Sequence, residues 1–243
     1  MRKLFILILA CAMILTFASC SKSSSSSSSA AATTQGAAAQ TTTTTPSTGT
    51  VDSEYDPNKT VDFTQETSED KRVVTKGTID KSLYKQPVFV TSFGQSTDAA
   101  MLDTVMKRIG VDYVYNATAT ADAIKGYKTV VIAVGASTKG LGAAGISESE
   151  ETARAKAIMD YIKANDVEVI CCHIGGSARR GTLSDLYADM VMDESSLIVL
   201  KEDANFDYKF TKYAEEHNVP ISLIYATKDA LTVFMEALER PHC

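Results

Sequence analysis

Apolar runs of strand length alternate with amphipathic segments of helix length from about residue 86 onward. The strand-like runs are PVFVTS (87–92), DYVYN (112–116), KTVVIAVG (128–135), VEVICCH (167–173), SLIVL (196–200) and VPISLIYA (219–226). The helix-like segments cover residues 96–109, 120–125, 148–165, 183–192, 206–218 and 228–238. In the third of these, apolar residues recur at three- and four-residue steps, the spacing of one helix face: Ala153, Ala157, Ile158, Tyr161 and Ile162.

Strands that are apolar throughout and separated by helices are typical of a parallel sheet covered on both sides. Right-handed crossovers then predict an α/β fold with a single doubly wound, mostly parallel sheet of five to six strands. Helices on both faces make this a three-layer sandwich of the Rossmann-like or flavodoxin-like kind. We expect one domain over residues 86–240, which is long enough to bury a real core.

The first 20 residues, MRKLFILILACAMILTFASC, have the pattern of an export signal. Arg2 and Lys3 precede an apolar stretch, residues 4–17, that is too short to cross a bilayer. The small residues before Cys20 resemble the lipobox of bacterial lipoproteins, in which the cysteine is acylated. We therefore predict a lipoprotein signal peptide over residues 1–19 and an exported, extracytoplasmic protein attached to the bacterial cell membrane through lipidation, of the palmitate type, at Cys20. A lipobox ending at Cys11 and an ordinary cleaved signal are the alternatives.

Residues 20–85 lack the composition of a folded domain. The stretch SKSSSSSSSAAATTQGAAAQTTTTTPSTGT has no aromatic or branched aliphatic side chain, so it cannot offset the entropy cost of folding. Residues 51–84 are charged with only scattered apolar positions. We predict a largely disordered tether and linker over residues 20–85.

Charge and cysteine usage exclude several classes. The chain has 24 Lys and Arg against 30 Asp and Glu, a net charge of −6, which argues against nucleic acid as a partner. The five cysteines show neither a disulfide framework nor zinc spacing. Cys171 and Cys172 are adjacent in one predicted strand, so their side chains should point to opposite faces. No cofactor and no metal are expected.

Three polar loops follow predicted strands: residues 92–96, residues 135–145, which we call the glycine-rich stretch, and residues 173–181. They should meet at one edge of the sheet, where ligands bind in open parallel sheets. Glycines there expose backbone N–H groups, and cations add charge in an otherwise acidic domain, so the loops predict a pocket for a small anion of the carboxylate or phosphate type. Solvated cations and glycines that only permit turns are the alternative. The candidate ligand-binding residues are Ser92, Gly94, Gln95, Ser96, Gly135, Ser137, Thr138, Lys139, Gly140, His173, Gly175, Gly176, Arg179 and Arg180.

Formal nucleotide motifs fail in this region. Residues 140–145 match G-x-G-x-x-G, but they start several residues beyond their strand and do not open the first βαβ unit. Leu141 and Gly142 stand where a phosphate-binding loop needs Lys and Ser or Thr. The chain is therefore not expected to be a dinucleotide-binding enzyme or an NTPase of that type.

Catalysis remains an alternative. Cys172 and His173 end a predicted strand before a Gly-Gly turn and faintly resemble the cysteine elbow of the amidotransferase-like superfamily. An exported hydrolase or transferase could act through His173 with Cys172 or a serine. A buried structural cysteine and a histidine that satisfies a backbone group are the competing interpretations. A third alternative is an interaction module for a protein of the cell envelope.

The strings GASTKGLGAAGIS and HIGGSARRGTLSD, together with SFGQS (92–96), are similar to those of a bacterial family, domain of unknown function 6305. The likeness covers roughly residues 86–238. It implies exported α/β proteins with no assigned activity, and it supplies no catalytic residue. The residues and the resemblance together favour a membrane-anchored lipoprotein that binds a small anionic solute, as an accessory to solute uptake with a transporter or another envelope partner.

Overall fold

The computed structural model of the chain describes residues 63–238, which form an α/β domain. Its strands are β1 (Val73–Lys76), β2 (Val88–Phe93), β3 (Tyr113–Tyr115), β4 (Thr129–Val134), β5 (Glu168–His173), β6 (Ser195–Lys201) and β7 (Ile221–Ile224). Its α-helices are α1 (Asp98–Ile109), α2 (Thr138–Ala144), α3 (Glu148–Ala164), α4 (Thr182–Met192), α5 (Lys209–His217) and α6 (Ala230–Ala237). Short 3₁₀ helices are η1 (Lys81–Leu83), η2 (Ala121–Ile124), η3 (Ser177–Arg179), η4 (Glu202–Asn205) and η5 (Thr227–Asp229).

The sheet has the order β1-β7-β6-β5-β4-β2-β3, and only the β1–β7 pair is antiparallel. The expectation of five to six strands was therefore too low, because the described residues contain seven. The additional strand, β1, lies in the stretch assigned to the linker. The sequence pattern did not predict this strand, because it is a half-buried edge strand of four residues, VVTK, without the continuous apolar run of the central strands.

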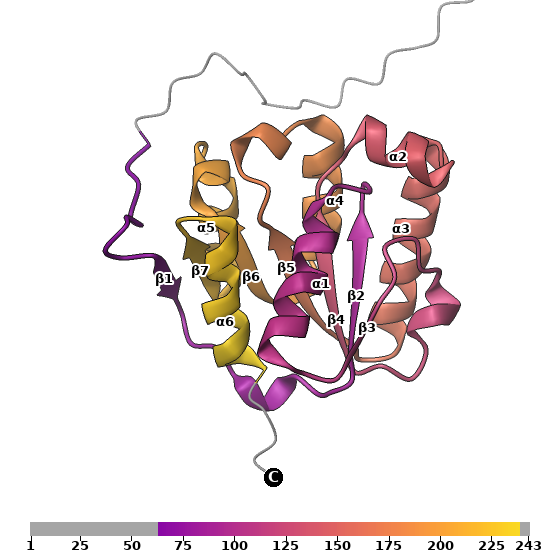
Figure 1. Cartoon of the computed structure of the whole chain (residues 1–243), viewed down its shortest axis with the longest axis horizontal. Coiled ribbons are helices and arrows are strands. Elements are labelled where there is room, and N and C mark those ends of the chain that lie inside the picture. The colour runs from indigo at the N-terminus through magenta and orange to yellow at the C-terminus, as the bar shows by residue number, and fades with distance from the viewer. Residues whose placement is uncertain (1–62, 239–243) are drawn as a thin grey trace, which may run out of the picture. The chain divides into compact units, whose positions relative to one another are not determined.

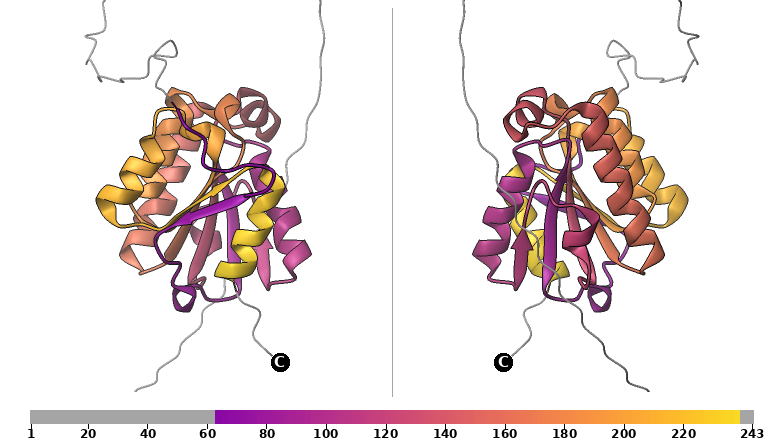
Figure 2. Two further views of the ribbon diagram at one scale, coloured as in Figure 1. Left: turned by 90° about the vertical axis from the view of Figure 1, so that its left-hand side faces the viewer. Right: turned by 90° about the vertical axis from the view of Figure 1, so that its right-hand side faces the viewer.

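The parallel strands reverse their winding between β2 and β4. α1 and α6 cover one face of the sheet, whereas α3, α4 and α5 cover the other, as the two side views show (Figure 1, Figure 2). The order differs from the Rossmann pattern, in which the first strand lies between the second and the fourth; here β2 lies between β3 and β4, as in the flavodoxin pattern. In such sheets the reversal point marks the usual place for a ligand.

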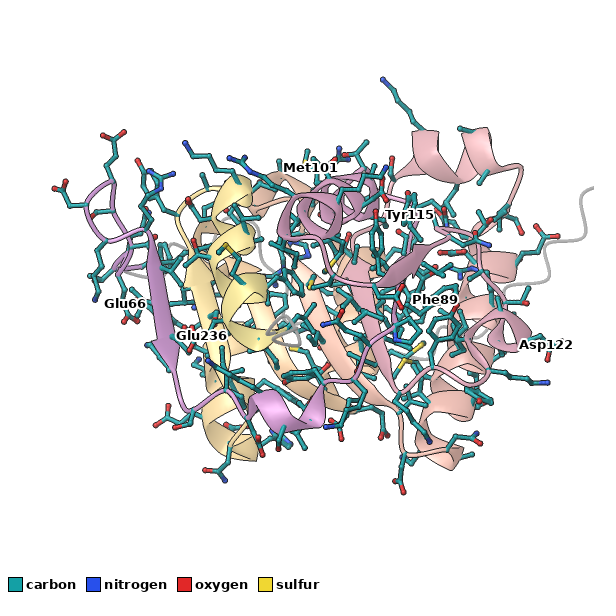
Figure 3. All side chains as sticks on the ribbon, turned by 60° about the horizontal axis from the view of Figure 1, so that its bottom comes forward. Glu66, Phe89, Met101, Tyr115, Asp122 and Glu236 are labelled. Carbon is teal, nitrogen blue, oxygen red and sulfur yellow. The ribbon has the colours of Figure 1, made fainter. Side chains whose placement is uncertain are left out.

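Alternation along each central strand divides the core into two layers. Phe89, on β2, packs toward α3 with its ring edge against Tyr127, and its neighbours Val88 and Val90 pack on the α1 side. Figure 3 shows such side chains filling the space between the sheet and its helices. Cys171 and Cys172 fall in opposite layers, as their adjacent positions predicted.

Two other expectations about elements need correction. Residues 120–125 form only the short 3₁₀ helix η2, not an α-helix. Residues 138–144 of the glycine-rich stretch form α2, a short helix, where an open loop was expected. No helix within residues 63–238 combines the length and the apolar character needed to span a bilayer.

Candidate functional site

The loops after β2 and β4 are joined to each other by backbone hydrogen bonds. The N–H of Gly135 donates to the carbonyl of Phe93 at 3.0 Å, and the N–H of Ser137 donates to the carbonyl of Gly94 at 2.8 Å. Gln95 and Ala136 form an isolated antiparallel bridge in the same place. The crevice that usually holds a ligand at the reversal point is closed here by main chain.

The glycine-rich stretch packs against the β2 loop instead of opening as a cradle. A Cβ on Gly140 would lie 1.8 Å from the carbonyl oxygen of Gln95, so only glycine allows this approach. The N–H of Gly140 donates to the side-chain oxygen of Ser137, which caps α2. Thr138 and Lys139 are exposed on this helix. The N–H groups of Gly135, Ser137 and Gly140, which were expected to face an anion, are therefore hydrogen-bonded inside the protein.

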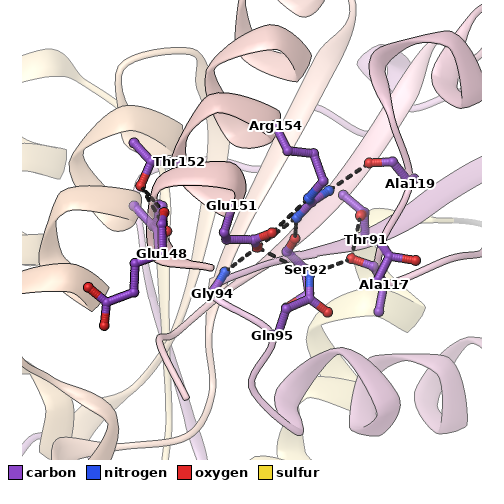
Figure 4. Close-up of polar contacts among 12 residues, drawn as sticks. Thr91, Ser92, Gly94, Gln95, Ala117, Ala119, Glu148, Glu151, Thr152 and Arg154 are labelled. Carbon is purple, nitrogen blue, oxygen red and sulfur yellow. Dashed lines mark hydrogen bonds and ion pairs between the residues drawn. The ribbon is translucent and has the colours of Figure 1, made fainter. Parts of the chain in front are cut away.

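A buried ion pair on α3 holds the β2 loop from the opposite side (Figure 4). The carboxylate of Glu151 accepts hydrogen bonds from the N–H of Gly94 at 2.7 Å and from the side-chain amide of Gln95 at 3.1 Å. Arg154 pairs with Glu151 at 2.7 Å and donates to the carbonyls of Ser92 and Ala119. Gly94 and Gln95, both expected to touch ligand, are thus used inside the protein.

Arg180 is likewise engaged in internal contacts. Its guanidinium is fully buried and pairs with Asp185 and Asp207, each at 2.7 Å. The Phe206 and Phe210 rings lie 4.8 and 5.2 Å from it. This cation has no surface left to offer an anion, so the structure separates it from its sequence neighbour Arg179.

His173 lies inside the same layer and is fully buried. Its Nδ1 is 3.0 Å from the carbonyl oxygen of Val134, and its Nε2 is 3.3 Å from that of Gly176. Burial lowers the pKa of His173, and the Arg180 charge lowers it further, although the two carbonyls raise it. The histidine links the end of β4 to the loop after β5, which agrees with the structural interpretation.

Cys172 does not form a nucleophile with His173. The two side chains belong to opposite faces of β5, and Cys172 is fully buried in the α1-side layer. Burial raises the pKa of the Cys172 thiol well above its usual value, and the nearby Cys171 and Asp98 raise it further. A thiol in this environment stays protonated and unreactive.

Three of the remaining predicted residues, Ser96, Gly175 and Arg179, lie around Asp98, the first residue of α1, which the sequence did not single out. The side chain of Ser96 accepts from the N–H of Asp98 at 3.3 Å. A Cβ on Gly175 would lie 2.6 Å from Asp98 Oδ2 and 2.4 Å from Cγ of Arg179, so both side chains pack against this glycine and only glycine leaves room for them. Burial raises the pKa of Asp98, while Arg179, the N–H of Gly175 and Ser96 lower it. We refer to Ser96, Asp98, Gly175 and Arg179 as the Asp98 cluster.

A periodic signal could have revealed Asp98. It precedes Leu102, Met106 and Ile109 at helical spacing, on the face of α1 that is buried. A carboxylate at a buried position of an amphipathic helix needs a partner or a function. An acidic residue in the first turn of a helix is also favourable for its interaction with the helix dipole, so its presence alone does not indicate that it is buried.

Two hollows of the described part lie away from this edge. One, of about 630 Å³, runs along α5 and β1 and includes Lys76, Tyr208 and Lys212 in its lining. The other, of about 390 Å³, lies between α1 and α6 at Ile109, Leu231 and Met235. Within residues 63–238 no three potential metal-binding side chains come together.

The sequence of residues 85–238 matches the model of one protein family, described as domain of unknown function DUF6305. The chain belongs to this family. The match covers the sheet from β2 to β7 and nearly all of the domain, including the Asp98 cluster. A search of curated proteins finds no match.

Solved structures with some similarity include hydrolases. A protein of Bacteroides fragilis NCTC 9343 that is only proposed to be an acylhydrolase shares 14% identity over 57% of this chain and 68% of its own, with a TM-score of 0.26. A GDSL-like lipase of Bacteroides thetaiotaomicron VPI-5482 shares 15% identity over 58% of this chain and 72% of its own, also with a TM-score of 0.26. A mutant of the esterase AlinE4 shares 10% identity over 65% of this chain and 86% of its own, with a TM-score of 0.24. Values this low establish no shared activity.

Proposed function

We propose that this protein is an exported, lipid-anchored protein whose α/β domain binds a small anionic ligand, of the carboxylate or phosphate type, beside Arg179. The supporting observation is the contrast between two adjacent arginines. Arg180 is buried between carboxylates, whereas Arg179 is half-buried and, among residues 63–238, its guanidinium has no hydrogen bond or contact ion pair. A planar guanidinium without a partner at a sheet edge is suited to binding carboxylate or phosphate.

The location of Arg179 also favours this site. It ends η3, directly after β5, at the edge where the carboxyl ends of the parallel strands meet. Lys139, exposed at the start of α2 after the neighbouring strand β4, adds a second cation near this edge. Since neighbouring parallel strands end side by side, charges that follow β4 and β5 add to the same local field.

Calorimetry on the full chain in detergent tests the proposal, with acetate, propionate, inorganic phosphate and methanesulfonate as probes. Arg179→Ala should weaken binding of the best probe roughly tenfold to a hundredfold, the effect of one charge-assisted hydrogen-bonded contact. Arg108→Ala is the matched control, because Arg108 is exposed near the other end of α1. Equal loss in both variants would point to net charge alone, and an unchanged affinity in Arg179→Ala would reject this site.

The anchor is a separate part of the proposal and has its own test. Cys20 lies outside the described residues, so its support is the signal sequence. Cells expressing the protein are labelled with radioactive palmitate, and the Cys20→Ser and Cys11→Ser variants are compared. Label that persists in Cys20→Ser but disappears in Cys11→Ser would move the anchor to the alternative position. If the parent protein takes up no label, the protein is not lipidated and this part of the proposal is wrong.

A further inference from the structure

Three buried side-chain oxygens within residues 63–238 have no hydrogen-bond partner. They are Ser92 Oγ, Asp98 Oδ2 and Asp203 Oδ1. All three lie toward the carboxyl edge of the sheet: Ser92 near the end of β2, Asp98 at the start of α1, and Asp203 directly after β6. Buried polar atoms are nearly always hydrogen-bonded, so a group of exceptions at one edge calls for a partner.

Asp98 is the clearest of the three, because the residue is only 1% exposed. Its side chain is close to Arg179, yet the two form no contact ion pair within residues 63–238. Both side chains pack against the Cα of Gly175, because a Cβ there would be 2.4 Å from Cγ of Arg179 and 2.6 Å from Asp98 Oδ2. The absence of a side chain at position 175 thus lets an acceptor and a cation come close together, although they form no contact ion pair.

Resting on the proposed function, we propose that the ligand is a small carboxylate that carries a hydrogen-bond donor beside its charged group, a hydroxy or amino acid. Arg179 would bind the carboxylate, and Asp98 Oδ2 would accept from the hydroxyl or ammonium group. An ionised carboxylate can only accept hydrogen bonds, so it complements a donor and repels a second bare anion. The Arg179 side chain swings outward to admit the ligand.

The proposal gives a direct rule for selectivity. A bare carboxylate reaches Arg179 but leaves Oδ2 of Asp98 without a donor. A molecule of the same size with a donor on the adjacent carbon satisfies both groups. Sites built to hydrogen-bond a polar group discriminate strongly against analogues that lack it, because a buried polar atom is then left unpaired.

The test compares propionate, lactate and alanine by calorimetry on the full chain in detergent. These probes share a three-carbon skeleton and differ in the group on the second carbon. We expect lactate or alanine to bind at least about tenfold more tightly than propionate. Whichever of the two binds better identifies the donor as hydroxyl or ammonium.

Asp98→Asn is then expected to reduce that preference to about twofold or less, whereas Asp160→Asn, an exposed position on α3, should leave it intact. Propionate binding as tightly as both analogues would overturn the inference and leave the proposed anion site standing. A preference retained in folded Asp98→Asn would also overturn it. Failure of all three probes, and of phosphate, to bind would overturn the anion site itself. The selectivity of the parent decides the case even if Asp98→Asn fails to fold.

Discussion

The carboxylate of Glu151 accepts the backbone N–H of Gly94 at 2.7 Å, although 57 residues separate them in the chain. Glu151 is fully buried on α3, and its charge is balanced by Arg154, which also donates to the carbonyl of Ser92 near the end of β2 and to that of Ala119 in the loop after β3. The pair therefore holds the end of β2 and the following turn in place. α1 and the Asp98 cluster begin directly after that turn.

Removal of Glu151 should strongly destabilise the domain. Glu151→Ala leaves the guanidinium of Arg154 and the N–H of Gly94 without their acceptor, and breaking a buried pair in this way costs about 3–5 kcal/mol. Urea unfolding followed by circular dichroism measures the free energy of unfolding. Asp160→Ala, an exposed position on the same helix, should change it by less than about 0.5 kcal/mol. Similar small effects in both variants would show that the pair contributes little.

Two glycines in α2 should respond in opposite directions to the same substitution. Gly140→Ala places a methyl group 1.8 Å from the carbonyl oxygen of Gln95, so we expect a loss of about 1–3 kcal/mol. Nothing lies within 4 Å of a Cβ on Gly142, so Gly142→Ala should stabilise the helix by about 0.5–1 kcal/mol. Chemical unfolding of the two variants checks both signs. A stabilised Gly140→Ala variant would mean that α2 does not pack on the β2 loop.

Most of the fold could be predicted from sequence because apolar strands and amphipathic helices leave a strong periodic signal. The continuous apolar runs in residues 128–135 and 167–173 located β4 and β5 closely. β1 carried no comparable signal, because an edge strand buries only half of its surface and its place depends on pairing with β7. Short-range pattern cannot show such pairing.

The site was less predictable because free and paired charges look alike in a sequence. Arg179 and Arg180 are adjacent, yet only the structure shows that Asp185 and Asp207 bind the second. Likewise, the glycines at 94 and 140 resembled an anion cradle, but Gly94 donates to Glu151 and Gly140 gives room for Gln95. Long-range contacts of this kind arise from the tertiary packing of α2 and α3.

The adjacent arginines should therefore have different effects on stability. Arg180→Ala leaves two carboxylates facing each other without their cation, and we expect the free energy of unfolding to fall by roughly 3–5 kcal/mol. Arg179→Ala removes a side chain that holds no direct hydrogen bond or ion pair in residues 63–238 and acts only through its charge on Asp98, so its effect should be well below that of Arg180→Ala. Thermal and urea unfolding without ligand compare the two. Equal destabilisation would indicate that Arg179 has a structural role, and its use for ligand binding would then be in doubt.

Asp98 should reduce the stability of the domain at neutral pH. Burial raises its pKa above the ordinary value of 3.8, so the folded protein holds this proton more tightly than the unfolded chain does. The contribution of this group to stability is then greatest below pH 3.8 and is lost as pH rises through the folded-state pKa. Asp98→Asn keeps the shape without the charge, so without ligand it should melt at a higher temperature than the parent at pH 7.

This advantage of Asp98→Asn should shrink as the pH is lowered toward 4, where the parent carboxyl takes up its proton. Melting temperatures measured from pH 4 to pH 7 give the difference curve, and Asp160→Asn supplies the baseline for loss of an exposed carboxylate. A variant less stable than the parent by the same amount at every pH would show that Asp98 acts as a structural hydrogen-bond acceptor. The expected result is that the melting temperature of Asp98→Asn exceeds that of the parent by more as the pH rises from 4 to 7. If the same variant also loses the preference for lactate or alanine over propionate, the charged form of Asp98 is kept at a cost to stability because the ligand needs it.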